Sequence, residues 1–235
     1  MEVFVGTSGY AYKEWKGSFY PEDQKPAEML RYYADRFRAV EINNTFYRMP
    51  KASVLAAWAE QVPPDFRFVL KGSQRITHMK RLKDVGEPVA YLLEAAATLG
   101  PRLGPILFQL PPTLRQDLPR LQGFLDLLPQ GQPFAFEFRH ESWDDEEVRA
   151  ALRARNAALV CADTEESGEA GAPIFPTADW GYLRLRRCDY TDALLEPWRQ
   201  RILAQPWERA FVFFKHEDDR PLGWETIRRF KDGFA

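Results

Sequence analysis

The stretch Phe134-Ala135-Phe136-Glu137-Phe138-Arg139 alternates phenylalanines with small or charged residues. Successive side chains on a β-strand point to opposite faces, so the three phenylalanines share one face and Ala135, Glu137 and Arg139 share the other. A strand with one fully apolar face and charges near its carboxyl end fits a barrel. In a barrel, one face of each strand packs beneath helices and the other looks inward.

Seven more segments complete the predicted set of strands. They are Val3–Gly6, Ala39–Asn43, Phe66–Lys71, Pro105–Leu110, Ala158–Ala162, Gly181–Arg186 and Ala210–Phe214, with Pro133–Phe138 as the fifth of the eight. Their starts lie roughly 23 to 39 residues apart, which leaves room for one crossover helix in most intervals. Periodicity predicts helices over Glu28–Phe37, Ser53–Gln61, Pro88–Leu99, Leu118–Leu128, Asp145–Arg155, Ala193–Leu203 and Gly223–Phe230, with Asp144 or Asp145 capping the fifth of these.

The interval Thr164–Asp179 differs, because it is rich in Gly, Glu and Pro and predicts an irregular loop. We therefore expect an α/β fold, a (β/α)8 TIM barrel, as a single domain over residues 1–235 with an irregular or missing helix after the sixth strand. An open doubly wound sheet is the alternative. The Gly-x-Gly-x-x-Gly with which such a sheet binds dinucleotides does not follow the first predicted strand, so we expect no nucleotide cofactor.

Composition excludes several classes of protein. The chain has 235 residues, a net charge of −2 and 45% hydrophobic residues, which is enough apolar material for a large core and argues against disorder. Its longest purely apolar runs have six residues, as at Val54–Ala59, whereas a membrane span needs about 20. Two cysteines, Cys161 and Cys188, cannot form a disulfide framework. With no secretory signal at the start of the sequence, we expect a cytoplasmic protein without a membrane partner.

Polar side chains gather near the carboxyl ends of the predicted strands, where TIM barrels carry their active sites. We predict that ligand is bound by Thr7, Ser8, Tyr10, Asn43, Lys71, Gln109, Arg139, Arg184 and Lys215. We predict catalytic roles for Glu41, Glu137, Asp163 and His140, of which the three carboxylates suit general acid/base work or one divalent metal ion. Cations outnumber acids at this end, so the expected ligand is an anion, since arginine forks match carboxylate and phosphate oxygens. The alternative is a purely structural network of internal salt bridges.

Several blocks of the sequence carry a family resemblance. They are Gly6-Thr7-Ser8-Gly9-Tyr10, Trp15-Lys16-Gly17-Ser18-Phe19-Tyr20-Pro21, the stretch from Val40 to Pro50, Lys71 with Ile76-Thr77-His78, Phe108-Gln109-Leu110-Pro111-Pro112, and Glu137-Phe138-Arg139-His140-Glu141-Ser142-Trp143. In this order they resemble the YecE-like family, domain of unknown function family 72. The resemblance implies a TIM-type barrel related to the xylose isomerase and endonuclease IV group, and it implies no settled activity.

Two departures from the family pattern bear on the ligand. Arg186-Arg187 follow Arg184-Leu185 where the family usually has His-Gly, and Lys215-His216-Glu217 replace an Asn-rich end of the last strand. They indicate either a more anionic ligand or the loss of part of the site. Three histidines in all, His78, His140 and His216, are too few for a trinuclear zinc site of the endonuclease type.

Three functions follow from this reading. The first is an enzyme that acts on a phosphorylated or carboxylated small molecule by acid/base or metal-assisted hydrolysis or isomerisation. The second is a nucleic-acid-binding or repair-related protein, by analogy with endonuclease IV. The third is a ligand sensor that keeps the pocket without the chemistry. The sequence identifies neither the substrate nor the metal, and it gives no oligomeric state.

Overall fold

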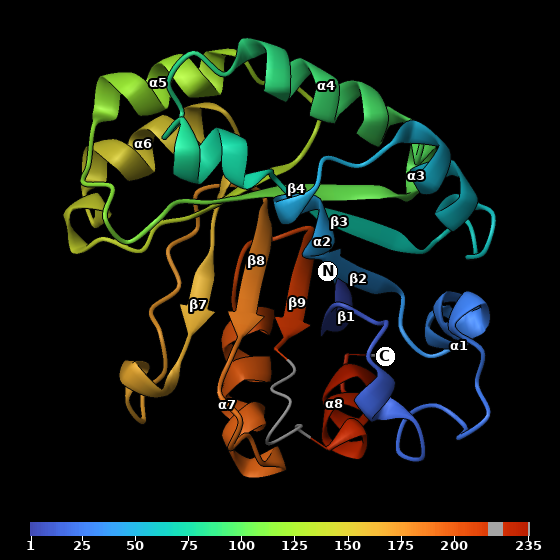
Figure 1. Ribbon diagram of the computed structural model, residues 1–235. Helices are drawn as coiled ribbons and strands as arrows, with labels where there is room; N and C mark the ends of the chain where they lie inside the picture. Colours follow the sequence, from blue (N-terminus) through green and yellow to red (C-terminus); the bar gives the residue numbers. More distant parts are fainter. Residues whose placement is uncertain (216–222, 235) are drawn as a thin grey trace.

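The strands pair in parallel and form one sheet that curls into a nearly closed barrel (Figure 1). The computed structural model describes residues 1–215 and 223–234. Within them, the strands are β1 (Glu2–Ser8), β2 (Ala39–Ile42), β3 (Arg67–Lys71), β4 (Leu103–Gln109), β5 (Phe134–Glu137), β6 (Ala158–Leu159), β7 (Cys161–Asp163), β8 (Trp180–Leu185) and β9 (Arg209–Phe214). Each predicted strand is confirmed, and the sixth is divided into β6 and β7.

The divided sixth strand is where the barrel meets itself. The order of the sheet is β6-β5-β4-β3-β2-β1-β9-β8-β7, so β6 pairs with β5 and β7 pairs with β8. Val160 separates the two halves and donates its backbone N–H to the carbonyl of Phe136 at 2.9 Å. Consecutive strands are neighbours all the way round, as expected for the predicted TIM barrel.

Helices surround the sheet on its outer side (Figure 1). They are α1 (Met29–Ala34), α2 (Asn44–Tyr47), α3 (Ala52–Ala59), α4 (Gly86–Ala97), α5 (Leu118–Asp126), α6 (Glu146–Ala154), α7 (Asp192–Leu203) and α8 (Trp224–Asp232). Asp145 begins α6, since its carboxylate accepts the backbone N–H of Glu147 at 2.7 Å, so one of the two predicted caps is confirmed. The segment 164–179 holds only a short turn, Glu165–Ser167, so the missing helix is confirmed as well.

The elements that the sequence did not predict include one directly after β2 and one after β3. The four-residue α2 follows β2, and a turn of π-helix over Arg75–Met79 follows β3. Both are too short to show a helical period in the sequence.

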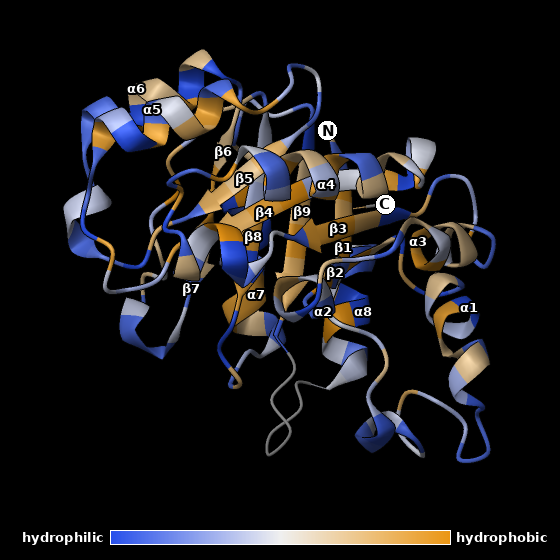
Figure 2. Cartoon of the chain, turned by 45° about the horizontal axis from the view of Figure 1, so that its top comes forward, coloured by the Kyte–Doolittle hydropathy of each residue, from blue (hydrophilic) through white to orange (hydrophobic). Residues whose placement is uncertain are grey.

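Apolar side chains form one layer inside the barrel and another between the strands and the helices. The inner layer consists of Phe4, Ala39, Val69, Leu107, Ala135, Ala158, Val160, Trp180, Tyr182, Phe211 and Phe213. Its aromatic side chains come from the neighbouring strands β1, β9 and β8, and Phe4 stacks on Phe211 with centroids 4.9 Å apart. The strands are accordingly the most hydrophobic part of the chain, and the helices expose hydrophilic faces (Figure 2). This layer fills the interior next to the polar side chains at the carboxyl ends of the strands, the end at which TIM barrels carry their active sites.

Among the helices of the described ranges, none combines the length and the apolar character that crossing a bilayer would require.

Candidate functional site

Polar side chains follow the inner apolar layer toward the carboxyl ends of the strands, where they form what we call the barrel mouth. They keep the inward phase of their strands: Ser8, Glu41, Lys71, Gln109, Glu137 and Arg184. Register places them at matching heights, because Ser8 is level with Glu41 and Gln109 is level with Glu137. The alternation of a strand therefore delivers these predicted residues to one place.

Glu41 is fully buried at the mouth and receives a hydrogen bond from each of three side chains. Ser8 Oγ donates to Glu41 Oε1 at 2.7 Å, and Tyr182 OH donates to Oε2 at 2.6 Å. Arg184 Nη2 donates to Oε1 at 2.8 Å. Burial alone would raise the pKa of Glu41, but Arg184 and the two hydroxyl donors outweigh it and lower that pKa. Glu41 is therefore ionised at neutral pH.

Glu137 lies on the other side of Arg184 and is bound in a similar way. Arg184 Nη1 donates to Glu137 Oε2 at 2.6 Å, Gln109 Nε2 donates to Oε1 at 2.7 Å, and Arg139 Nε donates to Oε1 at 3.0 Å. Burial opposes ionisation, but Arg184 and Arg139 lower the pKa of Glu137 to about 2. A carboxylate with such a pKa and so many donors is a poor general base, so Glu137 is better suited to holding cations in place.

Arg184 joins β2 and β5 from across the barrel, because it forms ion pairs with Glu41 and with Glu137. Its side chain is 3% exposed. Among the described residues, its Nε has no hydrogen-bond partner. We call Glu41, Arg184 and Glu137 the buried triad. These three groups pair with one another, as in the internal network of salt bridges that the sequence left as an alternative.

Lys71 ends β3 at the mouth and is half-buried. Its Nζ lies 4.4 Å from the centroid of the Phe46 ring, and no carboxylate of the described residues comes within ion-pairing distance of it. Burial and the neighbouring Arg184 lower the pKa of Lys71 to about 8. An amine of this kind is partly neutral near physiological pH, so it can both attract an anion and carry a proton.

Arg186 and Lys215 continue the positive charge along the rim. Arg186 is half-buried, and burial together with Arg184 lowers its pKa. Burial and Arg186 lower the pKa of Lys215, while Glu165 opposes the change. Arg139 adds to the lowering for both groups. His216 and Glu217, which were singled out in the sequence, lie outside the described residues.

His78 and Tyr182 belong to the mouth, although the sequence did not place them there. His78 lies on the π-turn, packs edge-on against Phe46 with centroids 4.9 Å apart, and shares a 2.9 Å hydrogen bond with Thr77 through Nδ1. Burial, Lys71 and Arg139 lower its pKa. The sequence could have predicted the place of Tyr182, because Tyr182 lies two residues before Arg184 on the same strand and its side chain therefore points to the same face.

Asp163 does not share a pocket with the two glutamates, so that prediction is wrong. Its strand carries Leu159 and Cys161 on the same face, and those side chains belong to the layer beneath the helices. Asp163 Oδ1 accepts the backbone N–H of Ala172 at 2.9 Å, and Oδ2 accepts the hydroxyl of Tyr190. The carboxylate therefore fastens the loop 164–179 and the segment before α7.

If Asp163 has this role, removing the Tyr190 hydroxyl should lower the stability of the protein. In Tyr190→Phe the buried Asp163 carboxylate keeps its desolvation but loses a donor, so we expect the free energy of unfolding to fall by about 1–3 kcal/mol in urea titrations. Tyr47→Phe is the matched control, because Tyr47 is 72% exposed and should change stability little. Equal stability of the two variants would contradict the assigned role.

Four other predicted residues occupy different positions around the mouth. Thr7 points away from it, since Thr7 Oγ1 bonds the Gly9 carbonyl at 2.7 Å and the hydroxyl of Tyr33 at 2.9 Å. Tyr10 packs against the outer layer, so Thr7 and Tyr10 do not contribute side chains to the mouth. His140 Nδ1 accepts the backbone N–H of Ser142 at 3.1 Å and caps a short turn.

Asn43 is the fourth of these residues, and it stays a candidate for binding. It precedes α2, and its Oδ1 is buried without a hydrogen-bond partner among the described residues. A buried amide oxygen without a donor is ready to accept one from a ligand.

A metal held by Glu41, Glu137 and Asp163 does not fit this arrangement. Arg184 lies between the two glutamates, and Asp163 faces the opposite side of the wall. In the ranges 1–215 and 223–234, no three His, Cys, Asp or Glu side chains gather in a way that could hold a metal ion.

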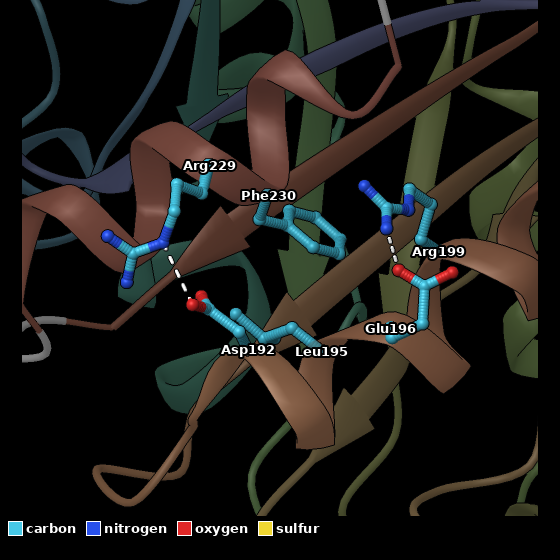
Figure 3. Close-up of a pocket in the computed structure, with 6 residues that line it drawn as sticks. All are labelled: Asp192, Leu195, Glu196, Arg199, Arg229 and Phe230. Carbon is cyan, nitrogen blue, oxygen red and sulfur yellow. Dashed lines mark hydrogen bonds and ion pairs between the residues drawn. The ribbon is translucent and has the colours of Figure 1, made fainter.

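A separate cavity of about 250 Å³ lies between α7 and α8 in the helical layer (Figure 3). Its charged side chains face each other in pairs, with Arg229 donating to Asp192 at 2.9 Å and Arg199 bound to Glu196. It contains no residue of the mouth and no unpaired charge, so it is not the candidate site.

Comparison with protein families gives one match that spans almost the whole chain. The family model described as "Protein of unknown function DUF72" matches residues 4–235. The UPF0759 protein YecE of Escherichia coli strain K12 is 30% identical over 168 residues, which cover 69% of this chain and 59% of that protein. The chain therefore spans 59% of the length of that relative. The UPF0759 protein YunF of Bacillus subtilis is 24% identical and is covered to 87%, over 99% of this chain.

Solved structures agree with these sequence matches. A DUF72 family protein from Thermotoga maritima superposes with a TM-score of 0.79 at 26% identity, over 100% of this chain and 99% of that one. A DUF72 family protein from Enterococcus faecalis gives a TM-score of 0.79 at 17% identity, over 98% and 95% of the two chains, which supports the fold alone.

Proposed function

This chain belongs to the DUF72 family, and we propose that it binds a small phosphorylated or carboxylated molecule at the barrel mouth and moves a proton on it. One observation carries the proposal. Glu41 and Glu137 are already paired with Arg184 and Arg139, which leaves Lys71 and Arg186 as positive charge in excess at the mouth. A partly buried cation without a counter-charge is costly, and an anion from solution removes that cost.

Lys71 is the group best suited to proton transfer. With a pKa of about 8, its amine is close to the working pH, as a general acid or base should be. Glu41 and Glu137 then serve as positioning residues that hold Arg184 and Arg139 toward the ligand. Hydrolysis or isomerisation by acid/base catalysis matches these groups.

A calorimetric titration with inorganic phosphate tests the binding step. We expect saturable binding of one anion per chain. Duplex DNA provides the comparison, because nucleic-acid binding would show an affinity that falls steeply with salt through the release of several counterions. Binding of DNA with such a slope, without saturable phosphate binding, would favour the nucleic-acid function. Binding of neither would contradict both. Turnover of a panel of phosphate monoesters and 2-oxo acids then separates an enzyme from a sensor.

The pKa of Lys71 also predicts how anion binding depends on pH. Sulfate is the suitable probe, because its charge is constant above about pH 3. Since the protonated amine attracts the anion, we expect sulfate affinity to be steady up to pH 7 and to fall by about tenfold as the pH rises through 8. Among the groups that act on Lys71, Glu41 and Glu137 have a lowered pKa and Arg184 has a raised one, so these three keep their charge over this range.

Lys71→Met should bind sulfate weakly and without this pH-dependent fall. An unchanged fall in the variant would assign the titration to another group.

A further inference from the structure

The barrel wall is open where the sixth strand is divided. In the described residues, no ladder of hydrogen bonds joins β5 to β7. Asp163 turns its carbonyl toward β8, because it accepts the N–H of Arg186 at 2.9 Å. By the alternation of a strand, the backbone groups of Ala162 point the other way, toward the continuation of β5. The gap is thus bordered by strand edges whose polar groups can meet a ligand.

A cavity of about 350 Å³ occupies this gap, and we call it the seam cavity. Its lining includes Leu159 and Cys161, which face the helical layer, and also Val160 and Ala162, which follow the inward phase. Residues from both faces of the same strand therefore border the cavity. Ala172, Pro173 and Phe175 of the loop 164–179 line it where the missing helix would have packed. The volume is that of a small ligand site.

The seam cavity and the barrel mouth share Arg139. Arg139 lines the cavity, and its side chain donates a hydrogen bond through Nε to Glu137 of the buried triad. Two acidic lining residues, Glu141 and Asp144, are exposed. Charge therefore orients a bound molecule, with its anionic group near Arg139 and its uncharged part within the wall.

The walls of the seam cavity suit a flat ring. Phe138 and Trp143 stack with centroids 4.5 Å apart and planes 11° apart, and both line the cavity. The Trp143 indole is fixed, because its Nε1 donates to the Leu114 carbonyl at 2.7 Å. His140 also lines it, with Nδ1 occupied by the Ser142 N–H. Aromatic walls with nearby polar groups favour an aromatic or heteroaromatic ring.

We propose that the seam cavity holds the aromatic ring of the same ligand whose anionic group lies at the barrel mouth, so that the substrate class is an aryl or heteroaryl phosphate or carboxylate. This inference rests on the proposed function of the mouth. It specifies an aromatic ring as the uncharged part of the ligand. It also gives a function to the space left by the divided strand and the missing helix.

Phenyl phosphate and methyl phosphate provide the test, because they carry the same charge and differ in the ring. We expect the wild-type protein to bind phenyl phosphate about tenfold more tightly, from burial of the ring. In Cys161→Leu the added side chain enters the cavity from the helical layer, away from the mouth, so the two probes should bind alike, while methyl phosphate binds as in the wild type. Ala204→Leu, at an exposed position on another face, is the matched control and should behave as the wild type.

A second measurement needs no substitution. In the wild-type protein, protons of the phenyl ring should show nuclear Overhauser contacts to the Trp143 indole. Equal binding of the two probes, or ring contacts elsewhere, would overturn the seam proposal and leave the anion site intact. Failure of both probes to bind would instead count against the proposed function itself.

Discussion

Replacing Arg184 by methionine is expected to lower the free energy of unfolding by about 3–5 kcal/mol. The substitution keeps much of the side-chain volume but leaves Glu41 and Glu137 buried without their shared cation. In the wild type, Arg184 bonds Glu41 at 2.8 Å and Glu137 at 2.6 Å, and no comparable cation replaces it in the interior of the described chain. Chemical unfolding followed by circular dichroism measures the loss.

The pH dependence identifies the cause of that loss. In the wild type, the folded-state pKa of Glu137 is about 2, below its value in the unfolded chain. Its stabilisation is therefore present above an unfolded pKa of about 4.3 and disappears as the pH falls toward 2. In Arg184→Met, the largest opposition to the effect of burial is removed, so we expect the pKa of both carboxyls to rise. The sign reverses, so the variant should gain stability as the pH is lowered from 7 to about 5.

Arg229→Met is the matched control, because Arg229 forms an ion pair with Asp192 at the surface, where the two side chains are 52% and 59% exposed. Exposed pairs contribute about 0–1 kcal/mol. If Arg184→Met cost no more than this control, or if its stability fell on acidification in the same way as the wild type, the buried triad would not hold the barrel together.

The second large effect is on binding. Lys71→Met should weaken phosphate or sulfate binding by about 10- to 100-fold, the range for losing a hydrogen bond to a charged group. Stability should be unchanged or raised, because burial and the neighbouring Arg184 disfavour the charged amine of Lys71 more than Glu41 and Glu137 favour it. A residue whose removal costs function but not stability is expected at a binding site.

Lys83→Met controls for the loss of one positive charge, because Lys83 is exposed and away from the mouth. It should bind the anion as the wild type does. Normal anion binding by Lys71→Met would contradict the assignment of Lys71 to ligand binding. So would a Lys71→Met variant that is unfolded at low temperature under conditions in which Lys83→Met stays folded.

The sequence predicts much of this fold because its strands repeat one simple pattern. The alternation in Phe134–Arg139 separates a face for the helices from a face for the interior, and the same phase places Glu41, Glu137 and Arg184 inside. The loop in place of the sixth helix follows from local composition. These features depend on neighbouring residues, so they are readable without coordinates.

Other features depend on how the barrel closes. Leu159-Val160-Cys161-Ala162 has apolar residues on both faces, so alternation cannot say which side looks inward, and Asp163 was placed on the wrong one. That Arg184 bridges two glutamates 96 positions apart follows only from the juxtaposition of β2, β5 and β8. This pairing changes the interpretation of both carboxylates from proton carriers to positioning groups.

The central claim is that the barrel mouth is an anion site, and the most direct measurement is an anomalous difference map from a crystal soaked in tungstate, a heavy tetrahedral dianion. We predict that its strongest peak lies within hydrogen-bonding distance of Lys71 and of Arg139 or Arg186. Peaks confined to the outer surface, with the mouth empty and the buried triad unchanged, would contradict the account.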